Sequence, residues 1–227
     1  MNNYKTIQYK GHTIKINYSE WYESPREWDN IGKMICWHRN YNLGDKHNFQ
    51  NSFDLLTELA RVNKYGNREF TNNQLIKRIE RAGYVILPLY LYDHSGITMR
   101  CSAFSCSWDS GQVGYIYAKL SEAKKDIGIK NLTRAKLAGY LESEVQTYDM
   151  YLTGEIYGFT VENKDGEHID SCGGYFGSAG IEQAIDEAKH AVNCEIKRAV
   201  KKHIEQVKNW IKNKVPIIYR KPLQLSF

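Results

Sequence analysis

The sequence predicts an α+β fold: a mostly antiparallel sheet of about six strands, several short helices and one long C-terminal helix packed across the sheet. Three observations predict this class. Residues 84–118 contain three apolar, strand-like runs separated by turn residues. Residues 155–172 contain two further runs on either side of an Asp-Gly pair, which suits a tight antiparallel hairpin. Residues 181–211 carry apolar side chains every three or four positions, the spacing of one helix face.

The N-terminal elements follow the same kinds of pattern. Residues 4–9 and 12–18 lie on either side of a Lys-Gly turn and predict a hairpin. Residues 31–37 are apolar enough for a short strand or a helical turn. Two short helices are expected at residues 51–65 and 71–82, and the second begins with a Thr-x-x-Gln capping box.

The central strands are expected at residues 84–92, 97–101 and 113–118. The first is apolar almost throughout, which is typical of a strand buried on both faces. Pro88 interrupts it, and since proline cannot donate to a sheet ladder, one side of the strand is expected to be unpaired or bulged there. The loop before the third strand combines aromatic and small polar residues, a common composition for a binding surface.

The C-terminal part should be mainly helical. A brief helix is expected at residues 121–127, and a longer one at 133–154 between a Thr cap and a Gly. Glycines in residues 173–180 could cradle a phosphate at a helix start, but the Lys-Ser/Thr of a P-loop is missing, so a flexible turn is predicted. The long basic helix spans 181–214 and ends at a proline, and residues 217–227 could add an edge strand.

Residues 1–227 are expected to form a single domain, because neither a linker nor an internal repeat divides them. The N-terminus lacks the apolar segment of a signal peptide, which predicts a location in the cytoplasm without membrane contact. Five cysteines without a framework spacing predict reduced thiols rather than disulfides. No cofactor is expected.

Charge is concentrated near the C-terminus. The chain carries a net charge of +5, yet residues 197–221 hold nine cations and one acid, so the remainder is mildly acidic. This distribution predicts a local contact with nucleic acid or an acidic partner. A purely solvated face that complements the helix dipole is the alternative. The predicted contact residues are Lys197, Arg198, Lys201, Lys202, Lys208 and Lys212.

Five segments resemble a family of uncharacterised proteins from bacteriophages and mobile elements of gut and low-GC bacteria. They are SPREWDN (24–30), WHRNYNLGD (37–45), YDHSGI (92–97), WDSGQVG (108–114) and YDMYLTG (148–154). The resemblance spans roughly residues 20–177 and leaves the basic helix outside. It implies a small accessory protein that acts on host or phage macromolecules, including one that counters host defence, and it implies no catalytic residues.

These features together predict a non-enzymatic phage or mobile-element protein that binds a host protein or nucleoprotein complex. An inhibitor of a nucleic-acid-targeting defence system, of the anti-CRISPR or anti-restriction type, is the leading expectation. Aromatic residues and arginine are enriched at protein interfaces. The predicted protein-binding residues are Trp28, Trp37, Arg39 and Trp108.

A metal-dependent nuclease or hydrolase that binds nucleic acid is the alternative. Histidine could act as a base and aspartate could orient it or bind a metal, with Ser110 or Cys106 as nucleophile. The Ser110-Gly111 pair lacks the preceding glycine of a nucleophile elbow. The candidate residues are His38, Asp45, Asp93, His94 and Asp109.

Two further alternatives concern a metal and self-association. A zinc site could use Cys36, His38, Cys101 and Cys106, but neither pair has the usual two-residue separation, so buried thiols are favoured and no metal is predicted. A structural or regulatory module could instead pair with a second copy of itself through the apolar stripe of the long helix.

Overall fold

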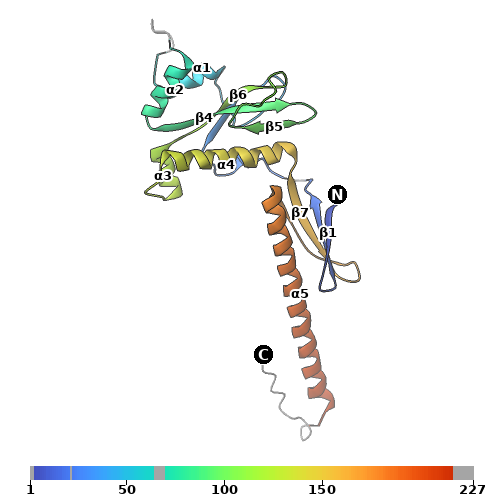
Figure 1. The fold of residues 1–227 in the computed structure, drawn as a ribbon. Helices are drawn as coiled ribbons and strands as arrows, with labels where there is room; N and C mark the ends of the chain where they lie inside the picture. The colour runs from blue at the N-terminus through green and yellow to red at the C-terminus, as the bar shows by residue number, and fades with distance from the viewer. Residues whose placement is uncertain (1–2, 21, 64–69, 217–227) are drawn as a thin grey trace. The chain divides into compact units, whose positions relative to one another are not determined.

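The computed structural model describes residues 3–20, 22–63 and 70–216, and Figure 1 shows their arrangement. The described residues form eight antiparallel strands in two four-stranded sheets, together with five α-helices. The α+β class is therefore confirmed, with two sheets instead of one. The chain divides into two compact units: unit 1 comprises Met1–Glu20 and Ile156–Phe227, and unit 2 comprises Trp21–Glu155. Unit 2 is thus inserted within unit 1.

The sheet of unit 1 combines strands from both sequence segments of that unit. Its strand order is β1-β2-β7-β8, and the central contact pairs β2 with β7. Both residues of the first turn, Lys10 and Gly11, have positive φ, as a two-residue primed turn requires. The strands are β1 (Asn3–Tyr9), β2 (His12–Tyr18), β7 (Ile156–Glu162) and β8 (His168–Phe176).

Helix α5 (Gly177–Lys214) covers one face of this sheet with its first half only. Ala184, Ala188 and Val192 are buried against the strands, and Ile196 is the last residue of α5 in that core. The predicted packing of the long helix on the sheet is therefore confirmed, but its apolar stripe is only partly covered: Val200 is 50% exposed and Val207 is 41% exposed. The reason is length, since 38 residues of helix extend about 57 Å and strands of seven to nine residues only about 23–30 Å.

The sheet of unit 2 has the order β3-β6-β4-β5. Pro88 lies opposite Tyr115 of β6, while β4 pairs with β5 only from Tyr90 to Asp93. The prediction that one side of the strand is unpaired at Pro88 is confirmed. The strands are β3 (Lys33–Cys36), β4 (Tyr84–Asp93), β5 (Ile97–Arg100) and β6 (Ser110–Lys119).

Helices cover both faces of the unit 2 sheet. One core joins the sheet to α3 (Leu120–Ile127) and α4 (Arg134–Thr153), where Leu137, Leu141 and Val145 are buried. The other joins it to α1 (Ser52–Leu59) and α2 (Asn72–Arg81). Burial on both faces explains the nearly continuous apolar sequence of β4.

The predicted elements within residues 3–216 correspond to observed ones, including the capping box that begins α2. Residues 31–37 contain strand β3, and the glycine-rich residues 173–176 belong to β8 instead of a flexible turn. The predicted edge strand at 217–227 lies outside the described residues. None of the helices described is both long and apolar enough to cross a bilayer. The expectation of a single domain stays a prediction.

Candidate functional site

An arginine and two carboxylates from distant parts of the chain meet inside unit 2. Arg26 lies in the short 3-10 helix η1 (Pro25–Glu27), and its side chain is 5% exposed. Its Nε and Nη2 donate to the two oxygens of Asp45 at 2.8 and 2.9 Å, and its Nη1 donates to Glu144 Oε2 at 2.9 Å. Burial acts to lower the pKa of Arg26, but the hydrogen bonds and charges of Asp45 and Glu144 outweigh it, so that pKa is raised.

This network gives Asp45 a structural role. Its Oδ2 accepts the backbone N–H of Met34 at 2.8 Å in addition to the arginine, so both carboxylate oxygens are already engaged. Glu144 likewise accepts the N–H of Ile31 at 2.8 Å. Asp45 thus connects its own loop to η1 and β3, and its place among the candidate catalytic residues stays a prediction.

Three loops at one end of the unit 2 sheet bring the other candidate residues together. The Tyr41 hydroxyl donates to Asp93 Oδ1 at 3.3 Å, and the His38 ring stacks on Tyr41 with centroids 4.9 Å apart. His94 Nδ1 lies 3.3 Å from Asp109 Oδ2, and the Asp93 N–H donates to the Asp109 carbonyl at 2.8 Å. Residues far apart in sequence thus form one surface.

We call this surface the Trp108 surface. It contains a shallow groove of about 460 Å³. The groove carries two carboxylates and one guanidinium, so its charge is mixed, and its edges combine aromatic and hydrogen-bonding groups. The residues that define the surface are His38, Arg39, Asp93, Trp108, Asp109 and Gln112.

Trp108 is the most exposed large hydrophobic residue described, with 95% of its surface accessible. The loop that carries it is held by hydrogen bonds. Arg100 Nε donates to the Ser102 carbonyl at 3.0 Å, and its guanidinium lies 3.9 Å from the centroid of the Phe104 ring. The Ser110 hydroxyl donates to the Cys106 carbonyl. An ordered loop therefore presents a large apolar ring to solvent.

The other two predicted aromatic contacts are placed differently. Trp37 is half-buried, donates from Nε1 to the Phe49 carbonyl at 3.0 Å and packs edge-on against His47, so much of it is structural. Trp28 follows η1 and is exposed, and Asn30 donates to its carbonyl at 2.8 Å. Of the three tryptophans, Trp108 has the least structural role.

The hydrolase alternative finds little support in this geometry. Ser110 donates to a carbonyl, and the Cys106 sulfur lies 3.8 Å from Asp109 Oδ2 rather than beside a histidine base. His94 pairs with Asp109, but neither candidate nucleophile contacts His94 in the described structure. Within residues 3–20, 22–63 and 70–216, no three His, Cys, Asp or Glu side chains are grouped so as to hold a metal ion.

Two of the thiols in the zinc alternative have raised pKa values. Burial, with a smaller effect of the Asp45 charge, raises the pKa of Cys36 to about 12. Burial and the Glu142 charge raise the pKa of Cys101 to about 11. Zinc binds the thiolate form. These cysteines therefore stay protonated near neutral pH.

The predicted basic residues lie in the distal half of α5, which we define as residues 197–214. This half contains seven cations and one acid, Glu205, and all seven cations are exposed. Trp210 in the same half is 62% exposed. The cations are Lys197, Arg198, Lys201, Lys202, Lys208, Lys212 and Lys214.

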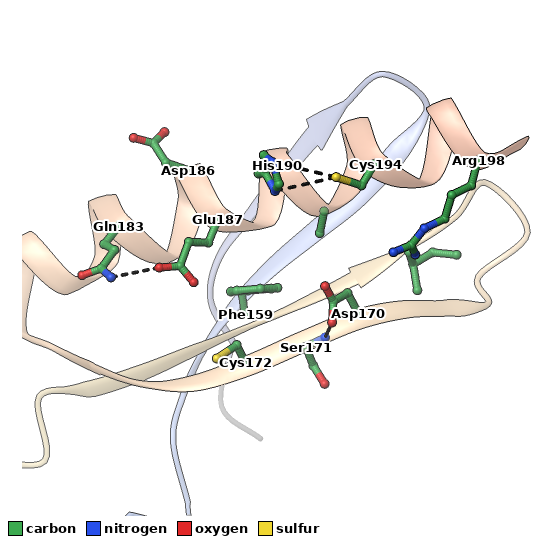
Figure 2. Close-up of a pocket in the computed structure, with 12 residues that line it drawn as sticks. Phe159, Asp170, Ser171, Cys172, Gln183, Asp186, Glu187, His190, Cys194 and Arg198 are labelled. Carbon is green, nitrogen blue, oxygen red and sulfur yellow. Dashed lines mark hydrogen bonds between the residues drawn. The ribbon is translucent and has the colours of Figure 1, made fainter. Parts of the chain in front are cut away.

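Sequence reasoning missed a groove of about 1190 Å³ in unit 1. Figure 2 shows side chains of α5 facing those of β8, with Phe159 between them. The Tyr175 hydroxyl donates to Glu187 Oε2 at 2.6 Å, and Gln183 donates to Oε1 at 2.9 Å. These bonds lower the pKa of Glu187, which keeps it ionised. With Asp170 nearby, the groove is unfavourable for phosphate.

No family model, curated protein or solved structure matches this chain. The resemblance to phage and mobile-element proteins therefore stays a prediction.

Proposed function

We propose that this protein is a non-enzymatic binding protein that contacts a host protein through the Trp108 surface, and that it thereby inhibits a nucleic-acid-targeting defence complex. The supporting observation is Trp108, an almost fully exposed tryptophan on a hydrogen-bonded loop. Tryptophan and arginine are enriched among the residues that dominate protein interfaces. Arg39 and Trp108 line the same groove.

The charge of the surface favours a protein over a nucleic acid. Asp93 and Asp109 would repel the phosphates of any nucleic-acid strand that lay against Trp108. A protein partner can pair these carboxylates with cations and cover the indole with apolar side chains. The order of the loop also limits the conformational entropy lost on binding.

A nuclease at this surface has less support, because Asp45 is engaged by Arg26 and the remaining candidates form no metal-binding group among the described residues. Binding explains the exposed indole, whereas catalysis does not require it.

The test compares Trp108→Ala with Tyr140→Ala, a control that removes an exposed aromatic side chain of α4 outside the Trp108 surface. Each full-length variant is used to capture partners from nuclease-treated host lysate, and the affinity for the purified partner is then measured by calorimetry. We expect Trp108→Ala to weaken binding about 30-fold or more, which corresponds to the ~2 kcal/mol of an interface hot spot. Tyr140→Ala should bind like the wild type.

The inhibitor function is tested by phage plating on a host that carries the defence system to which the captured partner belongs. Expression of the wild type and of Tyr140→Ala should restore plaque formation, and expression of Trp108→Ala should not. Unchanged partner affinity in Trp108→Ala would overturn the proposed surface. Tight binding without any rescue of plaques would overturn the inhibitor function.

A further inference from the structure

The distal half of α5 extends beyond the sheet that supports the first half (Figure 1). The first half, residues 177–196, carries four acids and one lysine, whereas the distal half carries seven cations and one acid. The charge therefore changes sign along a single helix, at the point where it leaves its core. Packing within unit 1 does not explain why the chain continues as a helix there.

The cations gather along one side of the distal half. Lys197, Lys201, Lys208 and Lys212 are separated by four, seven and four residues, so they project from one face. That face extends for about 22 Å at 1.5 Å per residue. The exposed apolar residues Val200 and Val207 occupy the neighbouring face. The cationic face thus borders an apolar one, and Ile204 lies between Lys201 and Lys208.

Some cations elsewhere in the described chain have acidic partners. Lys15 lies 2.6 Å from Glu162, and Lys189 lies 3.3 Å from Asp186. In the described part of the chain, by contrast, no ion pair involves the distal residues Lys197, Lys201, Lys202 and Lys208. These four charges remain uncompensated.

Such an arrangement is unfavourable for the isolated helix. Like charges four residues apart, such as Lys197 with Lys201, destabilise a helix. Most helical stability in proteins comes from tertiary packing, and the distal half has little of it in the described structure. A polyanion that lies along the face would remove the repulsion and favour the helix.

A second copy of the chain is a poor occupant of this segment. Pairing two distal halves through their apolar stripes would bring Lys201 and Lys208 close to like charges, with Glu205 as the one acid that each copy offers. Charge complementarity requires an anionic partner. A regular row of exposed cations suits regularly spaced phosphates.

We propose that the distal half of α5 binds the phosphate backbone of nucleic acid without reading its sequence. Binding stops near Arg198, since Asp170, Asp186 and Glu187 lie along the groove beyond it. The inference does not depend on the Trp108 surface. If both hold, the protein contacts protein and nucleic acid together, as a nucleoprotein target would require.

The test removes the four uncompensated charges in the full-length chain, as Lys→Gln at positions 197, 201, 202 and 208, since glutamine has a helix propensity close to that of lysine. The matched control makes the same change at four exposed lysines elsewhere: Lys125, Lys130, Lys136 and Lys164. Binding to fluorescein-labelled single-stranded and duplex DNA is measured by anisotropy over a series of salt concentrations.

We expect the wild type and the control to bind both probes with a strong salt dependence. Removal of the four distal charges should weaken binding by about tenfold or more and reduce the slope of log K against log salt by about 3, because each phosphate contact contributes ~0.7–0.9. The distal variant should still capture the protein partner after nuclease treatment, and Trp108→Ala should still bind DNA, which separates the two proposals.

Three results would overturn the proposal. Equal loss of binding in the control would show that only net charge matters. Polyglutamate that binds as tightly as DNA at the same salt would assign the face to an acidic protein. Light scattering that shows a dimer in the wild type and a monomer in the distal variant, without DNA binding by either, would assign the segment to self-association.

Discussion

Arg26 is the clearest case in which a single side chain supports several segments of unit 2. It joins η1 to Asp45 and to Glu144 of α4, and it donates to the Gly32 carbonyl at 2.6 Å. Its charge is compensated because both carboxylates accept from it. Loss of the arginine would leave two negative charges close together in a largely buried place.

We expect Arg26→Ala to lower the free energy of unfolding by about 3–5 kcal/mol, because removing one partner of a buried ion pair leaves the others uncompensated. Urea denaturation at neutral pH measures this free energy of unfolding. Arg100→Ala is the control: this guanidinium is exposed, and its carbonyl bonds and its contact with Phe104 should contribute about 1 kcal/mol. Equal losses in the two variants would show that the buried network is not stabilising.

The candidate residues could be chosen from sequence by chemical type, but their contacts could not. His38, Asp93 and Asp109 meet because β3 and β4 both pair with β6, a long-range arrangement that local patterns do not contain. The ion pair of Arg26 with Glu144 could not be predicted either, because the two residues are 118 positions apart in the sequence. The polar segments around Arg26 and Asp45 stood out in the sequence, but the sequence does not show whether these residues stabilise the fold or bind a partner.

At the scale of elements, periodicity and turn residues located nearly every helix and strand. The capping box of α2 and the apolar spacing of α4 are local signals, and local signals determine where a helix begins and which face is apolar. The extent of packing along α5 is different, since it depends on how far the neighbouring strands reach. The apolar stripe alone therefore predicted more packing than the sheet can provide.

Hydrogen exchange should divide α5 into two parts. Amides of residues 181–196, whose apolar face is packed on β7 and β8, should exchange at rates near those of the stable core. Amides of residues 197–214 should exchange much faster in the free protein, because that half lacks packing in the described structure. Helix α4, packed on its sheet, is the internal reference. Equal protection along all of α5 would contradict this account and indicate a partner already bound.

At the scale of the whole molecule, the division into two units could not be predicted from composition. No linker marks the boundary, because the chain passes into unit 2 soon after β2 and returns to unit 1 at the start of β7. β2 pairs with β7 across more than a hundred intervening residues. The Ser19 N–H donates to the Ile156 carbonyl at 2.8 Å, so the two points between which unit 2 is inserted lie next to each other.

We expect each unit to fold without the other. Each has its own buried core, and about 135 and about 90 residues are enough for independent folding. Residues 21–155 would be expressed alone, and residues 1–20 would be joined to 156–227 by a short Gly-Ser linker, which the Ser19–Ile156 contact makes feasible. Urea unfolding and amide NMR dispersion measure the result. Both shortened chains should unfold cooperatively, whereas a chain cut between β4 and β5 should not fold. If neither unit folds alone, residues 1–227 form one domain, and its stability depends on both cores together.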